Sequence, residues 1–330
     1  MSNTKHLADL VKVCSILPAL AIMPAIAEEY TVVSETEIAE IETISGGHSW
    51  LDASTASGNQ SVWFIKDGDV TVLSEAVFAN NRADSGIFST SSKAPSSLTL
   101  NPGVVFENNT VRFDGGAVAN YNTLNANGVT FRKNTAQTDF ENDTTPMGGG
   151  ALALGSESKT MIQDSIFSQN ESKYHGGAIA MRGPNDGDNS AADLDIIDSE
   201  FRGNIAAQNG GAIYSTFYDS ENVKDSVYIK GTEFTKNSAE RGGAIYTEGK
   251  ADLGGGLASM KIEGAKFTEN TATAGGGAIH NLSTLTIENS DFSGNKSISG
   301  NGDGGAIYTS KDLNFVANNR TNTFSGNYIQ

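Results

Sequence analysis

The chain has 330 residues, among them 37 Gly, 6 Pro and one Cys, and its 22 basic and 39 acidic residues give a net charge of −17. This acid excess argues against a nucleic-acid binder, which needs surplus Lys and Arg to displace counterions, and against electrostatic docking on an anionic membrane. A single Cys excludes a disulfide scaffold and a Cys-based zinc site. Hydrophobic residues (38%) and charged residues (18%) are both scarce, whereas disordered chains combine low hydrophobicity with high charge density. The composition therefore indicates a folded chain with an unusual, Gly-rich architecture.

Residues 1–27 have the layout of a secretory signal peptide. Lys5 and Lys12 precede an apolar stretch, and an A-x-A processing site ends at Ala27, directly before Glu28. The apolar stretch is shorter than the roughly 20 residues that a transmembrane helix needs. We therefore expect export with cleavage between Ala27 and Glu28, which also removes the only Cys.

Two short motifs alternate strictly along the rest of the chain. The first, Phe-x-x-Asn, has nine copies spaced 25 to 36 residues apart: Phe78/Asn81, Phe106/Asn109, Phe131/Asn134, Phe167/Asn170, Phe201/Asn204, Phe234/Asn237, Phe267/Asn270, Phe292/Asn295 and Phe324/Asn327. The second, Gly-Gly-Ala followed by an aliphatic residue, begins at Gly115-Gly116, Gly149-Gly150, Gly176-Gly177, Gly210-Gly211, Gly242-Gly243, Gly276-Gly277 and Gly304-Gly305. This many alternating copies indicates a repeat architecture in which each unit packs on its neighbours.

The spacing within a unit predicts short strands joined by corners. Leu285 and Ile287 have the period of 2 that marks a strand with one buried face. Ile287 and Phe292 are five residues apart and would lie on opposite faces of a straight strand, so we expect a bend at Asn289-Ser290. Gly-Gly-Ala-Ile is predicted to be a second strand, entered through glycines that tolerate positive φ and close backbone approach. No unit can bury its apolar face alone, so the pattern predicts an all-β parallel solenoid with Ile, Phe and Asn each stacked on its counterparts.

The recurring Asn is expected to have a specific role in such a stack. At a corner its side chain can cap backbone groups, and Asn tolerates left-handed backbone geometry. Asn repeated at one position can also form an amide ladder along the axis. An Asn that only marks surface turns is the alternative, and nine copies at a fixed distance from Phe argue against it. At about 4.8 Å between stacked strands, nine rungs predict a rod on the order of 40 Å long.

The paired motifs behind a signal peptide resemble the polymorphic outer membrane proteins of chlamydiae, over roughly residues 78–327. The resemblance implies a right-handed parallel β-helix of about nine rungs. It further implies an autotransporter passenger on the cell surface that adheres to host cells, with both motifs implicated in adhesion. Such autotransporters end in a membrane β-barrel, and no alternating ten-residue strands follow the repeats here. We expect membrane attachment only through a missing or separate barrel, and three segments: the signal peptide (1–27), an N-terminal cap region (28–68) and the β-helix (69–330).

Two acidic pairs are candidates for chemistry. Asp193 and Asp195 flank Leu194 on a predicted strand, would both point outward, and could form the acid/base pair of a polysaccharide lyase or hydrolase. A solvated strand face is the alternative, which we favour because no Lys or Arg visibly converges on the two acids. Asp186 and Asp188 offer oxygen ligands to calcium in a polar loop. Their loop lacks the spacing of known calcium-binding repeats, so we favour an ordinary polar loop.

Tyr214, Tyr246 and Tyr308 directly follow Gly-Gly-Ala-Ile and form a repeated column. Because neighbouring residues of a strand face opposite sides, an inward Ile predicts an outward Tyr. The column is then either an adhesive strip for protein or glycan, or a stack that covers the sheet face. His175 and His280 lie at different phases of the repeat, so we expect them not to stack and assign them no catalytic or metal-binding role.

These features predict an exported, cell-surface or secreted adhesin-like passenger without catalytic activity. It would bind a host-cell or cell-surface protein or glycan through a repetitive face, with affinity raised by avidity. A secreted β-helical polysaccharide lyase or hydrolase is the first alternative, and a purely structural surface protein is the second. We expect no cofactor, no metal and no nucleic-acid partner.

Overall fold

The computed structural model describes residues 31–33, 61, 63–65, 68–72, 76–137, 147–182, 192–220, 223–224, 226–250, 259–298, 304–317 and 320–330. The predicted signal peptide, with its cleavage site at Ala27 and Glu28, lies outside these ranges, as do Asp186 and Asp188. Every regular element within the ranges is a strand. The described residues thus include no helix that is long and apolar enough to cross a membrane.

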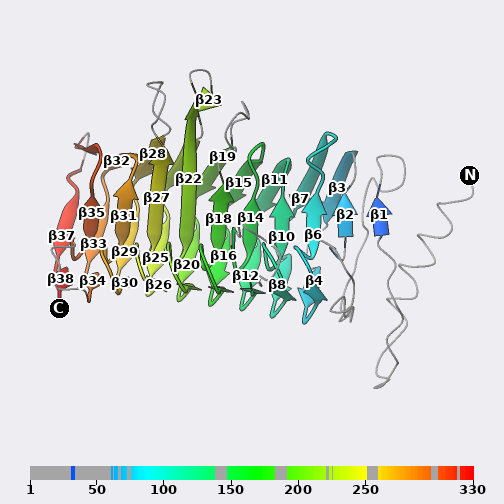
Figure 1. Ribbon diagram of the computed structural model, residues 1–330, viewed down its shortest axis with the longest axis horizontal. Helices are drawn as coiled ribbons and strands as arrows, with labels where there is room; N and C mark the ends of the chain where they lie inside the picture. Colours follow the sequence, from blue (N-terminus) through cyan, green and yellow to red (C-terminus); the bar gives the residue numbers. More distant parts are fainter. Residues whose placement is uncertain are drawn as a thin grey trace, which may run out of the picture.

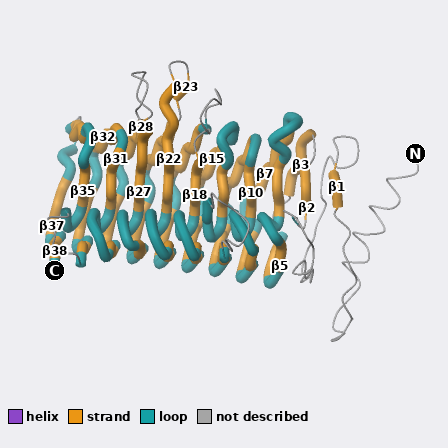
Figure 2. Tube along the Cα trace, viewed as in Figure 1, coloured by secondary structure: helices purple, strands orange, loops and turns teal. Residues whose placement is uncertain are grey.

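The strands form a right-handed parallel β-helix, as predicted. The strands belong to four sheets, which we name A to D, and each full rung passes through them in the order B, D, C and A. Nine rungs follow one another along the axis in the described part of the chain. Figure 1 shows the rungs side by side, with the N-terminal end on the right and the C-terminal end on the left. Figure 2 shows how short strands alternate with turns in every rung.

Sheet A carries the strands that follow the Gly-Gly corners. It contains β1 (Thr31–Val33), β2 (Trp63–Ile65), β6 (Phe88–Thr90), β10 (Val118–Asn120), β14 (Leu152–Leu154), β18 (Ile179–Arg182), β22 (Ile213–Ser220), β27 (Ile245–Lys250), β31 (Ile279–Leu282) and β35 (Ile307–Thr309). A short strand, β23 (Val223–Lys224), pairs antiparallel with the end of β22. β1 and β2 fall within the segment predicted as the cap region and continue sheet A in parallel.

Sheet B carries the aliphatic-x-Ile strands. It contains β3 (Gly68–Val72), β7 (Ser96–Leu100), β11 (Thr123–Asn127), β15 (Lys159–Gln163), β19 (Asp193–Ile197), β24 (Ser226–Lys230), β28 (Ser259–Glu263), β32 (Thr284–Glu288) and β36 (Leu313–Val316). Most of these strands alternate between buried and accessible residues, so sheet B has one face in the core and one face open to solvent.

Sheets D and C are narrower and carry the Phe-x-x-Asn motif. Sheet D contains β4 (Val77–Ala79), β8 (Val105–Glu107), β12 (Thr130–Arg132), β16 (Ile166–Ser168), β20 (Glu200–Arg202), β25 (Glu233–Thr235), β29 (Lys266–Thr268), β33 (Asp291–Ser293) and β37 (Thr323–Ser325). Sheet C contains β5 (Arg82–Ala83), β9 (Thr110–Val111), β13 (Thr135–Ala136), β17 (Glu171–Ser172), β21 (Ile205–Ala206), β26 (Ser238–Ala239), β30 (Thr271–Ala272), β34 (Lys296–Ser297) and β38 (Tyr328–Ile329).

The core is a set of columns in which like residues stack on like. Each motif Phe is the register partner of the next, and neighbouring rings stack with centroids 4.6–5.3 Å apart. The Ile residues of sheets A and B stack in the same way, for example Ile213 on Ile245 and Ile229 on Ile262. The stacking of Ile and Phe follows the predicted register.

The bend predicted between Ile and Phe is present, and it is made by a residue in left-handed conformation. Asn289 has φ 51°, and the same position holds Gly264, Gly231, Asp198 and Asp164, all with positive φ. Gly, Asn and Asp are the residues that adopt this conformation most readily.

The motif Asn forms the predicted amide ladder. The Oδ1 atom of Asn237 accepts hydrogen bonds from the backbone N–H and the Nδ2 of Asn204, at 3.0 and 2.9 Å. Its own Nδ2 donates to Oδ1 of Asn270 and to the carbonyl of Phe201, both at 3.0 Å. The left-handed residue at this corner is the one before the Asn, for example Lys236 with φ 56°.

The earlier rungs of the ladder, at Asn134 and Asn170, have the same arrangement. The Nδ2 of Asn134 donates to Oδ1 of Asn170 at 3.1 Å and to the carbonyl of Phe106 at 3.0 Å, so both residues belong to the ladder. The left-handed residues beside them are Lys133, with φ 54°, and Gln169, with φ 56°. The corner therefore turns at the residue before the Asn, which leaves the Asn side chain pointing inward to bond the next rung.

Candidate binding surface

The side chains of both repeat motifs lie inside the solenoid. The motif Phe and Asn residues from Phe106 to Asn295 are fully buried, as are the Ala residues of the Gly-Gly-Ala motifs from Ala117 to Ala278. Among the motif Phe residues in the described ranges, Phe324 in the last rung is exposed. The adhesive role that the resemblance implied for both motifs therefore cannot come from direct contact by these buried side chains.

Asn134 and Asn170 show the burial of the polar member of the motif. Both are repeat-motif residues that the sequence singles out, and both are 0% exposed, as the predicted stacking of Asn on Asn requires. Their amide groups are occupied by the neighbouring rungs, since Asn134 donates to Asn170 and Asn170 donates to Asn204 at 3.0 Å. They hold the rod together from within, and a binding partner cannot reach them.

The tyrosine column is a buried stack over most of its length. Tyr214 and Tyr246 are only 9% and 5% exposed, although they lie on the outer side of sheet A, and Tyr308 is half-buried. Ring centroids of Tyr214 and Tyr246 are 5.6 Å apart, and those of His280 and Tyr308 are 4.4 Å apart. Of the two alternatives, this arrangement corresponds to a stack that covers the sheet face.

His175 and His280 both belong to this one column, but, as predicted, their rings do not stack on each other. The ring of His175 stacks on Tyr214 with centroids 4.1 Å apart, and His280 stacks on Tyr246 at 5.1 Å. The strand residue beside Tyr214 is the small Ala180. His175 reaches the space outside it from the preceding turn, which explains how a residue at another phase joins the column.

Burial makes His175 a poor proton acceptor. Its Nδ1 is buried and has no hydrogen-bond partner among the described residues. Loss of solvent in this position lowers the pKa of His175 from 6.5 to about 3, and the charge of Arg182 contributes to the same shift. The side chain is therefore neutral at physiological pH and has a packing role.

We expect the stability of the folded chain to fall as the pH is lowered from about 6.5 to about 3, with a contribution from His175. In this window the unfolded chain binds a proton at His175 and the folded chain does not, so acid favours unfolding by about 1.4 kcal/mol per pH unit. His175→Phe keeps the ring stack and removes the proton site. Urea unfolding at several pH values should show a difference between the two proteins that reaches about 4–5 kcal/mol near pH 3. If the free energies of unfolding of the two proteins changed with pH in the same way, the lowered pKa of His175 would be contradicted.

Asp193 and Asp195 lie side by side on the outer face of sheet B, at two accessible positions of β19. The Ser226 hydroxyl donates a hydrogen bond to Asp193 at 2.7 Å, and Lys159 is the register partner of Asp193. Burial and the neighbouring charge of Asp193 raise the pKa of Asp195. The two acids lie on an open sheet face rather than in the depression described below, and they remain candidates without a cleft around them.

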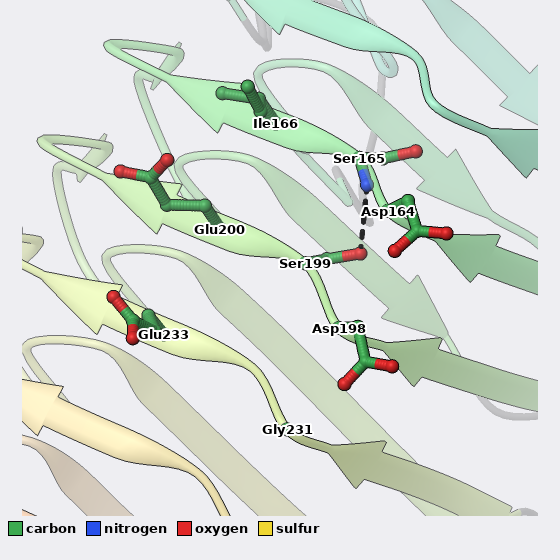
Figure 3. Close-up of a pocket in the computed structure, with 8 residues that line it drawn as sticks. All are labelled: Asp164, Ser165, Ile166, Asp198, Ser199, Glu200, Gly231 and Glu233. Atoms are coloured by element: carbon green, nitrogen blue, oxygen red, sulfur yellow. Dashed lines mark hydrogen bonds between the residues drawn. The ribbon is translucent and has the colours of Figure 1, made fainter. Parts of the chain in front are cut away.

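A shallow depression of about 310 Å³ lies at the corner between sheets B and D (Figure 3). Its acidic lining consists of Asp164, Asp198, Glu200 and Glu233. Glu200 is paired with Arg202 at 3.2 Å and Glu233 with Lys266 at 2.6 Å. No group of three or more His, Cys, Asp or Glu in the described ranges is arranged to hold a metal ion, so we assign the depression no metal.

The outer faces of the solenoid differ in how their charges are satisfied. Sheets D and C carry surface ion pairs between neighbouring positions, such as Arg132 with Glu107 at 2.6 Å. Sheet B carries a cluster in which Lys261 pairs with Glu263 and Glu288, at 3.3 and 3.4 Å, while the Tyr228 hydroxyl donates to Glu263 at 2.9 Å. The accessible residues of these faces, which vary from rung to rung, are the part of the described chain that a partner can reach.

Comparison with known proteins agrees with the repeat architecture. Four segments of the chain, residues 198–216, 231–248, 265–282 and 289–310, match the model of the Chlamydia polymorphic membrane protein repeat. The probable autotransporter YfaL of Escherichia coli strain K12 is 34% identical over 143 residues, which make up 41% of this chain and 10% of that relative. No solved structure matches the chain. The β-helix is therefore similar to the Chlamydia polymorphic membrane protein repeat over these four segments, and to part of a probable autotransporter.

Proposed function

We propose that the chain is an exported, non-catalytic, adhesin-like passenger that binds a host-cell or cell-surface partner through the outer faces of its β-helix. The observation that carries the proposal is the burial of the motif side chains. Because the motifs build the rod and leave the outer positions free to vary, the variable positions are those that can encode recognition. The matched repeats and the autotransporter relative support a surface location.

Contact at several rungs at once can give a high overall affinity even when each single contact is weak. Outer positions of one sheet recur about every 4.8 Å along the axis, so several rungs can engage an extended or clustered partner together. Linked contacts of this kind can raise the overall affinity by about 10² to 10⁴. A rigid rod also loses little conformational entropy on binding.

The test is adhesion of beads coated with the purified chain to cultured epithelial cells and to bacterial cells. We expect the cells to retain more beads that carry the folded chain than beads that carry albumin. We also expect that replacing outer residues of one sheet reduces retention without changing the circular dichroism spectrum. A sheet B set (Lys159, Met161, Tyr228 and Lys261 to Ser) and a sheet D set (Arg132, Arg202, Thr235 and Thr268 to Ser) serve as matched controls for each other. Retention no greater than that of albumin on every cell type would contradict the proposal.

A further inference from the structure

Three outer residues of sheet B form a row across neighbouring strands. Met161 of β15, Asp195 of β19 and Tyr228 of β24 are register partners. All three face solvent, since the flanking residues on β19, Leu194 and Ile196, are fully buried. A carboxylate thus lies between a thioether and a phenol ring on an open sheet face.

Asp195 is the charged residue of this row, and its carboxylate is not paired with a cation or a hydrogen-bond donor in the described part of the chain. Asp193 accepts a hydrogen bond from Ser226, and Glu263 is bound by Tyr228 and Lys261. The side chain of Asp195 forms no hydrogen bond and no ion pair with any described residue. A carboxylate that is partly shielded from water and has no partner is unfavourable on its own, and burial accordingly raises the pKa of Asp195.

The flanking side chains suit a long cationic side chain. Met161 is 44% exposed, one of the more exposed large apolar residues in the described chain. On the far side of the row, the Nζ of Lys261 lies 5.7 Å from the ring centroid of Tyr228, so this ring already packs against one cation. The methylene stem of an Arg or Lys could pack on Met161 and Tyr228 while its charged end meets Asp195.

We propose that the row of Met161, Asp195 and Tyr228 binds an arginine or lysine side chain from an extended segment of a protein partner. The inference rests on the proposed binding function and names the chemistry of the partner. The net charge of −17 favours approach of a basic segment. Asp193 lies two residues along the same face, about 7 Å away, so a partner with cations at alternate positions can address both acids.

Fluorescence anisotropy with a labelled hexapeptide of alternating Thr and Arg tests this site on the full chain. Citrulline replaces Arg in a matched neutral peptide, and measurements at about 0.15 M salt screen attraction beyond about 8 Å. Asp195→Asn removes the charge with little change of shape. Asp69→Asn is the matched control, since Asp69 is an exposed carboxylate on β3 of the same sheet. Circular dichroism checks that each variant is folded.

We expect Asp195→Asn to weaken binding of the Arg peptide about five-fold, Asp69→Asn to change it less than two-fold, and the citrulline peptide to bind more weakly than the Arg peptide. Equal losses in both variants would reduce the effect to general charge attraction and overturn the proposal. Binding of a neutral oligosaccharide that is lost in Tyr228→Ser and kept in Asp195→Asn would assign the row to a glycan and also overturn it. Bead adhesion separates the two proposals: intact adhesion without Asp195-dependent peptide binding overturns this site alone. Asp195-dependent peptide binding without adhesion supports the site and contradicts the cell-binding function.

Discussion

Replacing Gly211 with Ala is expected to lower the free energy of unfolding by about 4 kcal/mol or more, near the upper end for a single substitution. A Cβ at this position would lie 2.1 Å from the carbonyl oxygen of Gly243 and 2.5 Å from the backbone nitrogen of Ser238, both in the next rung. Backbone atoms cannot rotate away as a side chain can, so the rungs would have to separate. Urea unfolding of the full chain, followed by far-UV circular dichroism, measures the loss, and limited proteolysis should cut near the damaged corner.

Gly203→Asn is the matched control for this steric argument. Gly203 has φ 61°, and a Cβ there would lie 3.8 Å from its nearest neighbouring atom, the Cγ of Gln169. Asn80 and Asn108 occupy the equivalent position of other rungs with φ 60° and 54°, so Asn fits this conformation. We expect a change of about 1 kcal/mol or less. Equal destabilisation by both substitutions would mean that the second Gly of the motif is not selected for close approach.

The solenoid and its core columns could be predicted because the constraints are local and repeated. The bend between Ile287 and Phe292 follows from their odd separation, and the structure places it at Asn289. The stacking of Phe on Phe and Asn on Asn follows from fixed spacing within each unit. In a solenoid, residues at equivalent positions of successive units are neighbours. A correct assignment of one repeat therefore predicts the contacts between units along the whole axis.

The outer layer could not be predicted in the same way. Alternation places Tyr214 on the outer side of its strand, but it does not say what covers that side. The structure covers Tyr214 with His175, which comes from a turn and fills the space beside Ala180. The sequence also does not indicate which residue is left-handed at the Phe-x-x-Asn corner. Lys236 adopts this conformation with φ 56°, which is uncommon for Lys and is not suggested by composition.

The binding row on sheet B is accessible to sequence reasoning only in part. Met161, Asp195 and Tyr228 each precede the core Ile of their unit by one residue, so aligning the units places them side by side. The spacing within one strand instead draws attention to Asp193 and Asp195 as a pair, and it gives no information about the neighbours of Asp195 on the adjacent strands. Whether a surface carboxylate has a partner depends on side-chain geometry, and spacing alone cannot supply that.

Asn237→Leu is the second substitution for which we expect a large effect, a loss of about 3–6 kcal/mol. Leu has a similar size, but it removes four hydrogen bonds between buried groups. Oδ1 no longer accepts from the N–H and the Nδ2 of Asn204, and Nδ2 no longer donates to Oδ1 of Asn270 and to the carbonyl of Phe201. Each buried polar group left without a partner costs about 1–3 kcal/mol. Because the ladder is continuous, we expect the loss to appear as reduced cooperativity of urea unfolding as well as a lower midpoint.

Two further variants distinguish the loss of the ladder hydrogen bonds from a change in side-chain volume. Asn125→Leu replaces an exposed Asn on β11 and should change stability by about 0.5 kcal/mol or less. Asn237→Asp keeps the shape but replaces a donor that faces two acceptors, Oδ1 of Asn270 and the carbonyl of Phe201, with a carboxylate oxygen. Protonation restores one donor, so the buried carboxyl should have a raised pKa in the folded chain. Its destabilisation should then be smallest below about pH 4 and should grow as the pH rises toward that raised pKa. A loss in Asn237→Asp that does not depend on pH would mean that hydrogen bonding along the ladder does not set the stability of the rod.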